Sequence, residues 1–246
     1  TMAVKKAGSR IRFSWETIVN DGQIGLLERL PIELAQKAAG KEDEEVTKQL
    51  VSHTGLNTDN FNSTNQNLLA GNGALTLETL EAAIEAANLQ TFKGNLITPI
   101  STFALVVPRA LEMTARRILA VQSVRTEETV GSIVTTRVSG NPIGTQVQIV
   151  VNDWTTRINS GAGAYWFLVP VPGQGLNPNL ALGFLRGYET PELRIKMNGG
   201  TFLGGGDVPA RDGSFDNDDF EMRIRHIATG GFIVPTGTIA SKGDGS

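Results

Sequence analysis

Two histidines are the first side chains to consider, because a base beside a nucleophile is the usual basis of hydrolytic chemistry. The chain contains His53 and His226, and neither lies near a Gly-x-Ser-x-Gly segment that would present a serine on a sharp turn. A catalytic triad is therefore not expected. We expect structural roles instead, with His53 at the end of a helix and His226 on the apolar face of a strand.

The acidic segment Asp212–Asp219 is the second candidate for chemistry. Its carboxylates suit calcium, but their spacing differs from that of an EF-hand loop, so a turn before a strand is the simpler interpretation. The glycine-rich segments 71–73 and 199–206 lack the lysine and hydroxyl pair of a phosphate-binding loop. The chain has no cysteine, which excludes disulfides and thiolate metal sites. We expect no catalytic residue, no metal and no cofactor.

Composition places the chain among globular proteins and excludes several partners. Its 246 residues are 40% hydrophobic and 19% charged, which suffices for a buried core. The net charge of −3 provides no global positive field for sequence-specific DNA binding. No apolar run approaches the roughly 18 residues that cross a bilayer, and no signal peptide is recognisable. Synthesis in the cytosol, with no membrane partner, is expected.

The first half of the chain alternates between strand and helix patterns. Ile11, Phe13 and Trp15 share one face of a predicted strand. Apolar residues then recur at helical intervals from about Gln23 to Ser52, with a kink or break expected at Pro31 and Gly40. The charged run 41–45 is expected on the solvated face of this helix. An acidic surface that binds a partner is the alternative for that run.

The asparagine-rich segment 57–67 predicts an irregular surface loop, and a domain boundary is expected near Gly71–Gly73. Thr76 is placed to cap a helix that begins at Leu77. A buried strand is predicted at 103–107, followed by a helix with Pro108 in its first turn. The remainder is predicted to be rich in strands, at 133–138, 146–151, 165–169, 193–197 and from Phe220 onward.

Three segments carry a resemblance to a known family. They are Trp15-Glu16-Thr17-Ile18-Val19-Asn20-Asp21, the run from Phe103 through Val107-Pro108 and Leu111-Glu112 to Leu119, and the tail from Phe220 through Gly230-Gly231 to Ser241. In order and spacing they resemble major capsid proteins of tailed phages with the Hong Kong 97 fold, especially Mu-like head subunits. The resemblance implies an α+β subunit that builds a shell and is not an enzyme.

The resemblance also implies a division of the chain. Residues 1–22 correspond to the remnant of an extended loop, and 23–74 to a peripheral domain with a long spine helix and a β-sheet. Residues 75–190 correspond to an axial α/β domain, and 191–246 to strands that return to the peripheral domain. Relatives carry an N-terminal arm and an ascending loop half ahead of the residues that match here.

Partners and contacts follow from the same resemblance. The implied partner is the protein itself, in pentamers and hexamers of an icosahedral shell around double-stranded DNA, with scaffold, portal and decoration proteins as further partners. The implied location is the virion, with assembly in the host cytoplasm. The predicted contacts between subunits are Lys5, Lys6, Arg12, Trp15, Glu16, Arg29, Arg223 and Arg225.

Several alternatives stay open at the level of sequence. Lys5 and Lys6 either form salt bridges between subunits or, as in some relatives, a lysine–asparagine isopeptide bond, which needs a buried acid beside the pair. An encapsulin-like compartment shares the fold and is the alternative function. A hydrolase or carbohydrate-binding α+β domain is a further alternative, although the sequence offers no convergent catalytic set.

Overall fold

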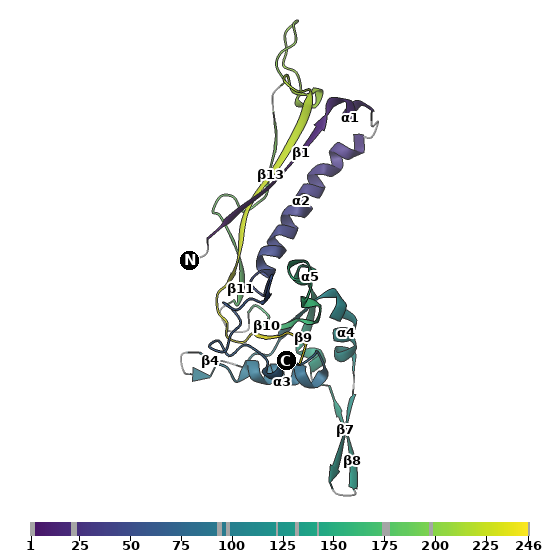
Figure 1. Cartoon of the computed structure of the whole chain (residues 1–246), viewed down its shortest axis with the longest axis vertical. Helices are drawn as coiled ribbons and strands as arrows, with labels where there is room; N and C mark the ends of the chain where they lie inside the picture. Colours follow the sequence, from purple (N-terminus) through teal and green to yellow (C-terminus); the bar gives the residue numbers. More distant parts are fainter. Residues whose placement is uncertain are drawn as a thin grey trace. The chain divides into compact units, whose positions relative to one another are not determined.

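The computed structural model describes residues 3–20, 24–92, 95–96, 99–121, 123–130, 133–141, 143–173, 178–196 and 199–245. The chain forms two compact units, each made of two segments (Figure 1). The first unit comprises Thr1–Val46 and Leu182–Gly230, and the second comprises Thr47–Ala181 and Gly231–Ser246. The division after Val46 differs from the boundary expected near Gly71–Gly73.

The first unit is a long helix packed on a twisted sheet. Its strands are β1 (Lys5–Ser14), β12 (Glu192–Ile195) and β13 (Asp219–Phe232), joined by β11 (Leu180–Phe184), and its helices are α1 (Trp15–Asn20) and α2 (Ile24–Thr47). The sheet order is β1-β13-β11, with β12 also paired to β13. Figure 1 shows α2 running alongside β1 and β13. Leu30, Leu34 and Ala38 of α2 are buried against Phe220 and neighbouring apolar residues of β13, as the helical and alternating patterns predicted.

Helix α2 continues through both residues that were expected to interrupt it. Pro31 and Gly40 lie inside the uninterrupted helix, so the predicted break is wrong, while the predicted kink stays a prediction. Burial of Leu30 and Leu34 on the sheet outweighs the local cost of these residues. The helix also ends at Thr47 and not at Ser52, because Val51–Ser52 forms β2 and pairs with β3 (Gly55–Leu56). The predicted start at Gln23 lies outside the described residues.

The charged run at the end of α2 is only partly solvated, contrary to expectation. Glu45 is 3% exposed, and Lys41 and Lys5 approach it at 3.3 and 3.5 Å. The Glu42 carboxylate lies 2.6 Å from Nε2 of the buried His226 ring. These carboxylates therefore fasten α2 to the sheet, because each faces a cation or an imidazole inside the unit.

The strand before α1 is longer than predicted and ends one residue earlier. Ile11 and Phe13 are half-buried and face the core of the first unit, but Trp15 begins α1 and is 38% exposed. The Ser14 hydroxyl is 3.4 Å from the Thr17 N–H and accepts from it. A serine at this position favours the start of a helix, which explains why Trp15 leaves the strand.

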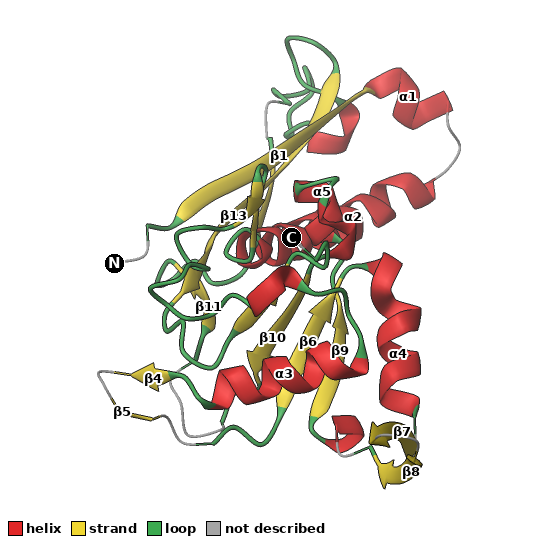
Figure 2. Ribbon diagram, turned by 60° about the horizontal axis from the view of Figure 1, so that its bottom comes forward, coloured by secondary structure: helices red, strands yellow, loops and turns green. Residues whose placement is uncertain are grey.

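The second unit is built on a mixed four-stranded sheet with the order β14-β10-β6-β9. These strands are β6 (Phe103–Val107), β9 (Val147–Val151), β10 (Trp166–Pro170) and β14 (Ile239–Ser241). Figure 2 shows α3 (Leu77–Asn88) crossing in front of the strands and α4 (Glu112–Ala120) beside them. The core joins Leu80 and Ala83 of α3 to Phe103 and Leu105 of β6. The predicted strand 103–107 and the helix from Leu77 are confirmed.

The remaining elements of the second unit are short, apart from one hairpin. The hairpin pairs β7 (Ser123–Val130) with β8 (Ile133–Gly140). The others are β4 (Thr91–Phe92), β5 (Asn95–Leu96), α5 (Trp154–Ile158) and 3₁₀ turns at Ala70–Asn72, Arg109–Leu111, Ile143–Thr145 and Ala162–Ala164, with a fifth turn in the first unit at Ala210–Asp212. No helix in the described part of the chain has the length and apolar character needed to cross a membrane.

The predictions for the helix starts and for the asparagine-rich loop were partly correct. Thr76 caps α3 in a reciprocal arrangement with Thr79, as predicted. Pro108 precedes the 3₁₀ turn as its N-cap and has a ψ of 160°, so it does not occupy the first helical turn. The asparagine-rich loop does satisfy its own backbone, for example through Asn65, which donates to the Asn60 carbonyl at 2.9 Å. Asn67, however, is fully buried and is part of the framework, not of the surface.

Candidate functional site

The two histidines support the structure and are not arranged for catalysis. His53 lies in the turn between β2 and β3, not at a helix end as expected, and its Nδ1 is 3.0 Å from the Ile158 carbonyl oxygen. His226 is 3% exposed on β13 and contacts Glu42 and the Phe184 ring. Among the described residues, no group of three or more histidines and carboxylates is placed to hold a metal ion.

The acidic segment before β13 forms a turn that is held by ion pairing. Ser214 donates to Asp219, which is 5% exposed and also pairs with Arg12. Asp218 accepts the Trp15 N–H at 2.9 Å through its carbonyl oxygen. The segment therefore links β13 to the junction of β1 and α1, in agreement with the structural interpretation.

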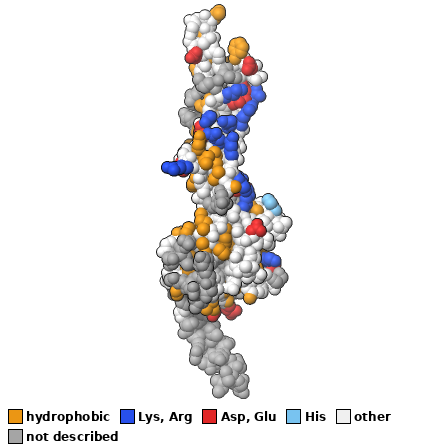
Figure 3. All heavy atoms as spheres, turned by 90° about the vertical axis from the view of Figure 1, so that its left-hand side faces the viewer, with side chains coloured by type: hydrophobic (Ala, Val, Ile, Leu, Met, Phe, Trp, Pro, Cys, Tyr) orange, Lys and Arg blue, Asp and Glu red, His pale blue; other side chains and the backbone are white. Residues whose placement is uncertain are grey.

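The outer face of the first unit's sheet is strongly charged. In Figure 3 lysine and arginine side chains gather on the surface of the first unit. Arg10 and Arg12 of β1, Arg194 of β12 and Arg223 of β13 stand on this face, since cross-strand partners point to the same side of a sheet. Lys196 follows directly after β12. We call these five residues the basic face.

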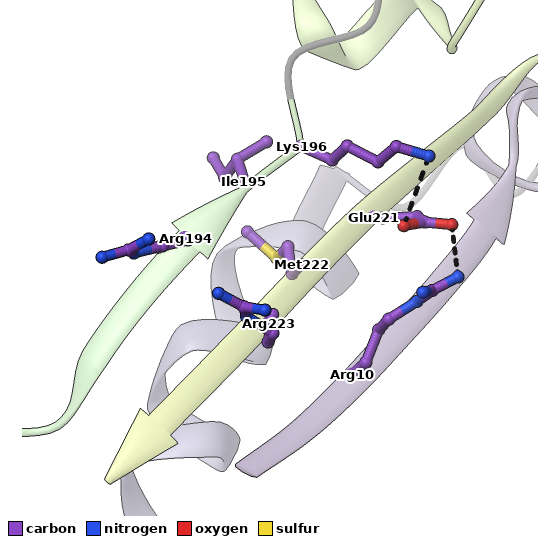
Figure 4. Close-up of a pocket in the computed structure, with 7 residues that line it drawn as sticks. All are labelled: Arg10, Arg194, Ile195, Lys196, Glu221, Met222 and Arg223. Carbon is purple, nitrogen blue, oxygen red and sulfur yellow. Dashed lines mark hydrogen bonds and ion pairs between the residues drawn. The ribbon is translucent and has the colours of Figure 1, made fainter.

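One buried carboxylate lies in the middle of the basic face. Glu221 is 6% exposed, and its carboxylate lies 2.8 Å from Arg10, 3.7 Å from Arg12 and 3.8 Å from Lys196. Alternation along β13 places Glu221 on the charged face of the sheet, yet it is buried, because long cationic side chains lie over it. Figure 4 shows two of them, Arg10 and Lys196. A carboxylate so placed holds the strands together and offsets part of the positive charge.

Hydrogen bonding lowers the pKa of two carboxylates on this sheet. The Ser214 hydroxyl, and then the Arg12 guanidinium, hold the pKa of Asp219 below its usual value, while burial opposes them. Hydrogen bonding from Arg194, with a smaller contribution from Arg225, does the same for the pKa of Glu192. Because these pKa values are lowered by folding, the charged carboxylates stabilise the folded subunit above the ordinary carboxyl pKa.

Acid should therefore remove the contribution of Asp219. The stabilisation by the charged Asp219 carboxylate is fully present above about pH 4, the ordinary carboxyl range. It is lost as the pH falls through the lowered folded-state pKa. We expect the Asp219→Asn variant to melt at a lower temperature than the parent at pH 7, with the difference disappearing below about pH 4. Melting curves of both proteins from pH 7 to pH 3 measure this, and a constant difference across that range would exclude the assigned role.

The comparison with protein families identifies the chain. The sequence profile of a family described as phage capsid protein matches residues 1–241. The chain belongs to the phage capsid protein family. A comparison with curated proteins found no match. This family is structural and not enzymatic, so the protein is a capsid shell subunit and the hydrolase alternative is excluded.

Solved structures show that this capsid protein has the Hong Kong 97 fold. A phage-related protein of Bordetella bronchiseptica matches with a TM-score of 0.54 and 11% identity, over 99% of this chain and 75% of that one. The head protein of Helicobacter pylori bacteriophage KHP40 matches with 0.52 and 8%, over 98% and 75%. The SrpI encapsulin of Synechococcus elongatus matches with 0.51 and 12%, over 99% and 75%. The α+β class is confirmed, and the Mu-like subtype stays a prediction.

The residues predicted to link capsid subunits are mostly on the surface. Those with exposed side chains are Lys5, Lys6, Arg12, Trp15, Glu16, Arg29 and Arg223. Arg225 differs, because it pairs with Glu192 and lies 5.3 Å from the centroid of the Tyr188 ring. The pKa of Glu16 is lowered by hydrogen bonds from its own backbone N–H and from Ser14. Lys5 pairs with the buried Glu45 inside the chain.

Three members of the basic face, and the carboxylate that lies among them, were not predicted from the sequence. Arg10, Arg194, Lys196 and Glu221 come together only through the pairing of β13 with both β1 and β12. Alternation along β13 indicated which of its residues share a face, but it could not indicate the neighbours on other strands. The signal that could have found them is the excess of arginine and lysine at alternate positions of the segments 10–12 and 194–196.

Proposed function

We propose that the protein assembles through pentamers and hexamers into an icosahedral phage shell that encloses double-stranded DNA, and that its place is the virion after assembly in the host cytoplasm. The observation that carries this proposal is the family match over residues 1–241, nearly the whole chain. The fold shared with a phage head protein supports it. The function is mechanical, since the subunit supplies shape and contacts and no reaction.

Shell formation rests on many modest contacts. Each subunit presents different surfaces to its neighbours, and such heterologous contacts close into rings when the rotation between subunits allows it. Individually weak contacts then become durable, because a closed shell holds every subunit by several of them at once. We assign the exposed residues Lys6, Arg12, Trp15 and Arg29 to such contacts. Arg225 serves mainly within its own subunit, and Lys5 does so through Glu45.

The two units correspond to the domains of such a subunit. The first unit contains the long helix α2 and the strands that return to it, which supports its assignment to the peripheral domain with the spine helix. The strand β1 before α1 is assigned to the remnant of the extended loop. The second unit, with its four-stranded sheet, is assigned to the axial domain.

In this proposal the shell encloses DNA without binding a specific DNA sequence. The net charge of −3 gives no global attraction for phosphates, and an acidic shell does not retain the genome through counterion release. Scaffold, portal and decoration proteins are further partners by analogy with the family. An encapsulin-like compartment is the second candidate, supported by the match to the Synechococcus elongatus structure, whereas the sequence profile favours the phage shell.

Native mass spectrometry of the purified chain tests the ring stage of this proposal. We expect complexes of five and six copies in equilibrium with larger assemblies, because pentamers and hexamers are the closed units of an icosahedral shell. Their abundance should rise with protein concentration, as mass action requires. A protein that remains a monomer at every concentration would refute the proposal.

A further inference from the structure

Three arginines stand side by side across the sheet of the first unit. Arg223 of β13 is the direct cross-strand partner of Arg10 on β1 and also of Arg194 on β12. Figure 4 shows the three side chains on their three strands. We call Arg10, Arg223 and Arg194 the arginine row. Like charges that face one another directly across strands destabilise a sheet, so the row needs anions to offset its charge.

The rows on either side of the arginine row already contain their own anions. Arg12 stands opposite Glu221 on one side, and Arg225 stands opposite Glu192 on the other. The two outer arginines form ion pairs with the carboxylates of these neighbouring rows. Arg10 contacts Glu221 at 2.8 Å, and Arg194 contacts Glu192 at 2.5 Å.

Arg223 is the central residue and is left without such a contact. Its side chain is exposed, and no carboxylate among the described residues pairs with it. Substitution at this position therefore breaks no internal ion pair. The guanidinium is available to an anion that comes from outside the subunit, with its five donors in a planar fork that fits a carboxylate.

A groove of about 310 Å³ opens beside this residue. The arginine row lines it together with Lys196, Glu221, Ile195 and Met222. Met222 is buried, but Ile195 is 46% exposed, so apolar surface lies in water at the edge of the groove. A segment that combines carboxylates with aliphatic stems would cover both kinds of surface, whereas a lone inorganic anion would leave the apolar surface wet.

The same chain carries an exposed row of carboxylates on helix α3. Glu78, Glu81 and Glu85 lie on one face of the helix, since their spacing of three and four residues returns to the same side. All three side chains are exposed, and no cation in the described part of the chain pairs with them. Like charges at this spacing repel one another, and this acidic row, like Arg223, has no ion-pair partner among the described residues.

The two rows match in length. Three adjacent strands separated by about 4.8 Å place the outer arginines about 10 Å apart. Seven residues of helix at about 1.5 Å each place Glu78 and Glu85 about 10 Å apart. The arginine row, in which Arg223 lacks an internal anion, therefore has the same span as the three carboxylates of α3.

We propose that the arginine row of one subunit docks the acidic row of α3 from a second copy, with Arg223 against Glu81 at the centre. The proposal rests on the proposed function and names one contact within it. It is a heterologous contact, because the two surfaces differ, and repetition of such a contact generates rings. A nucleic acid is the less favoured occupant, since phosphates would meet the central carboxylate of Glu221 and the net negative charge of the chain.

Charge reversal and its compensation test the pairing in the full chain. We expect Arg223→Glu alone, and Glu81→Lys alone, each to lower the assembled fraction about tenfold in low salt, because each places like charges face to face. The chain that carries both changes should assemble within about twofold of the parent, since the pair is restored with its signs exchanged. Sedimentation velocity at fixed concentration measures the assembled fraction.

Two controls separate assembly from folding. Arg186→Glu reverses an exposed arginine outside the groove and should leave assembly unchanged. Arg223→Glu should melt no earlier than the parent as an isolated subunit, because it places an anion between Arg10 and Arg194. A variant that melts earlier and fails to assemble would instead show that Arg223 is required for folding, which overturns its role as a free docking group.

The outcomes also separate this inference from the proposed function. Parent shells that assemble equally well with either single reversal would overturn the docking while leaving the shell proposal intact. Suppose that association is weakened by each single reversal and restored by the double change, but yields only dimers or short open chains of subunits. That result would support the docking and refute the shell. Normal assembly of Arg223→Glu together with loss of binding to a short DNA duplex would assign the row to phosphate and overturn the docking. A parent that never self-associates would refute both.

Discussion

Replacing Gly230 with alanine should destabilise the first unit by about 3 kcal/mol. Gly230 lies on β13 where this strand passes the end of α2, and a Cβ atom there would stand 2.1 Å from the Glu45 carbonyl oxygen and 2.8 Å from the Val46 Cα. Both obstacles are backbone atoms of a helix, which cannot rotate away as the end of a side chain could. The strand and the helix must separate, and that separation disturbs the burial of Glu45 beside its cations.

Thermal unfolding followed by circular dichroism measures this effect. A loss of about 3 kcal/mol corresponds to a melting temperature about 6–12 °C lower for a chain of this size. Gly163→Ala is the matched control, because an added Cβ at that position meets no atom within 4 Å. Equal melting temperatures for the parent and Gly230→Ala would show that β13 and α2 do not approach as closely as described.

Replacing Trp166 with alanine should cost about 3–5 kcal/mol in the second unit. Trp166 is fully buried in β10 and packs in the main core with residues such as Phe103 and Leu168. Its Nε1 donates to the Gly73 carbonyl oxygen at 3.1 Å. Removal of the indole leaves a cavity that neighbouring strands cannot fill, because they are held by their own hydrogen bonds.

A graded series separates packing from hydrogen bonding at this position. Trp166→Phe keeps much of the ring volume, and the Gly73 carbonyl still accepts from the Ser241 hydroxyl at 2.8 Å, so we expect a loss of only about 1–2 kcal/mol. Trp154→Ala, at a half-buried tryptophan near Arg157, serves as the control outside this core. Urea unfolding measures the stability of all three variants. A Phe variant as unstable as the Ala variant would show that the hydrogen bond, and not packing, accounts for the stabilisation by Trp166.

Strong local periodicity made part of the fold predictable. The alternation of Phe220, Met222 and Ile224 on β13, and the apolar face of α3, follow from repeats that only one secondary structure satisfies. The ends of elements were less accessible. Trp15 continues the alternation of apolar residues along the strand, yet the cap at Ser14 starts a helix there. Pro31 predicts a break, although the packed face of α2 keeps the helix continuous.

The surface chemistry was predictable only along single strands. Alternation assigned Arg223 and Arg225 to one face, but it could not show that Glu192 neutralises Arg225 while Arg223 stands between two other arginines. That difference depends on the register of β13 with β12 and with the distant β1, which no local pattern encodes. The burial of Glu221 has the same origin, since its three cations come from β1 and from the end of β12.

Negative-stain electron microscopy of the purified chain, with the solution mass of the same sample, tests whether this subunit assembles into a shell. We expect closed shells, or rings with fivefold and sixfold symmetry, together with a mass many times the 26.3 kDa of one chain. A uniform monomer would contradict the assignment of this subunit to a self-assembling shell.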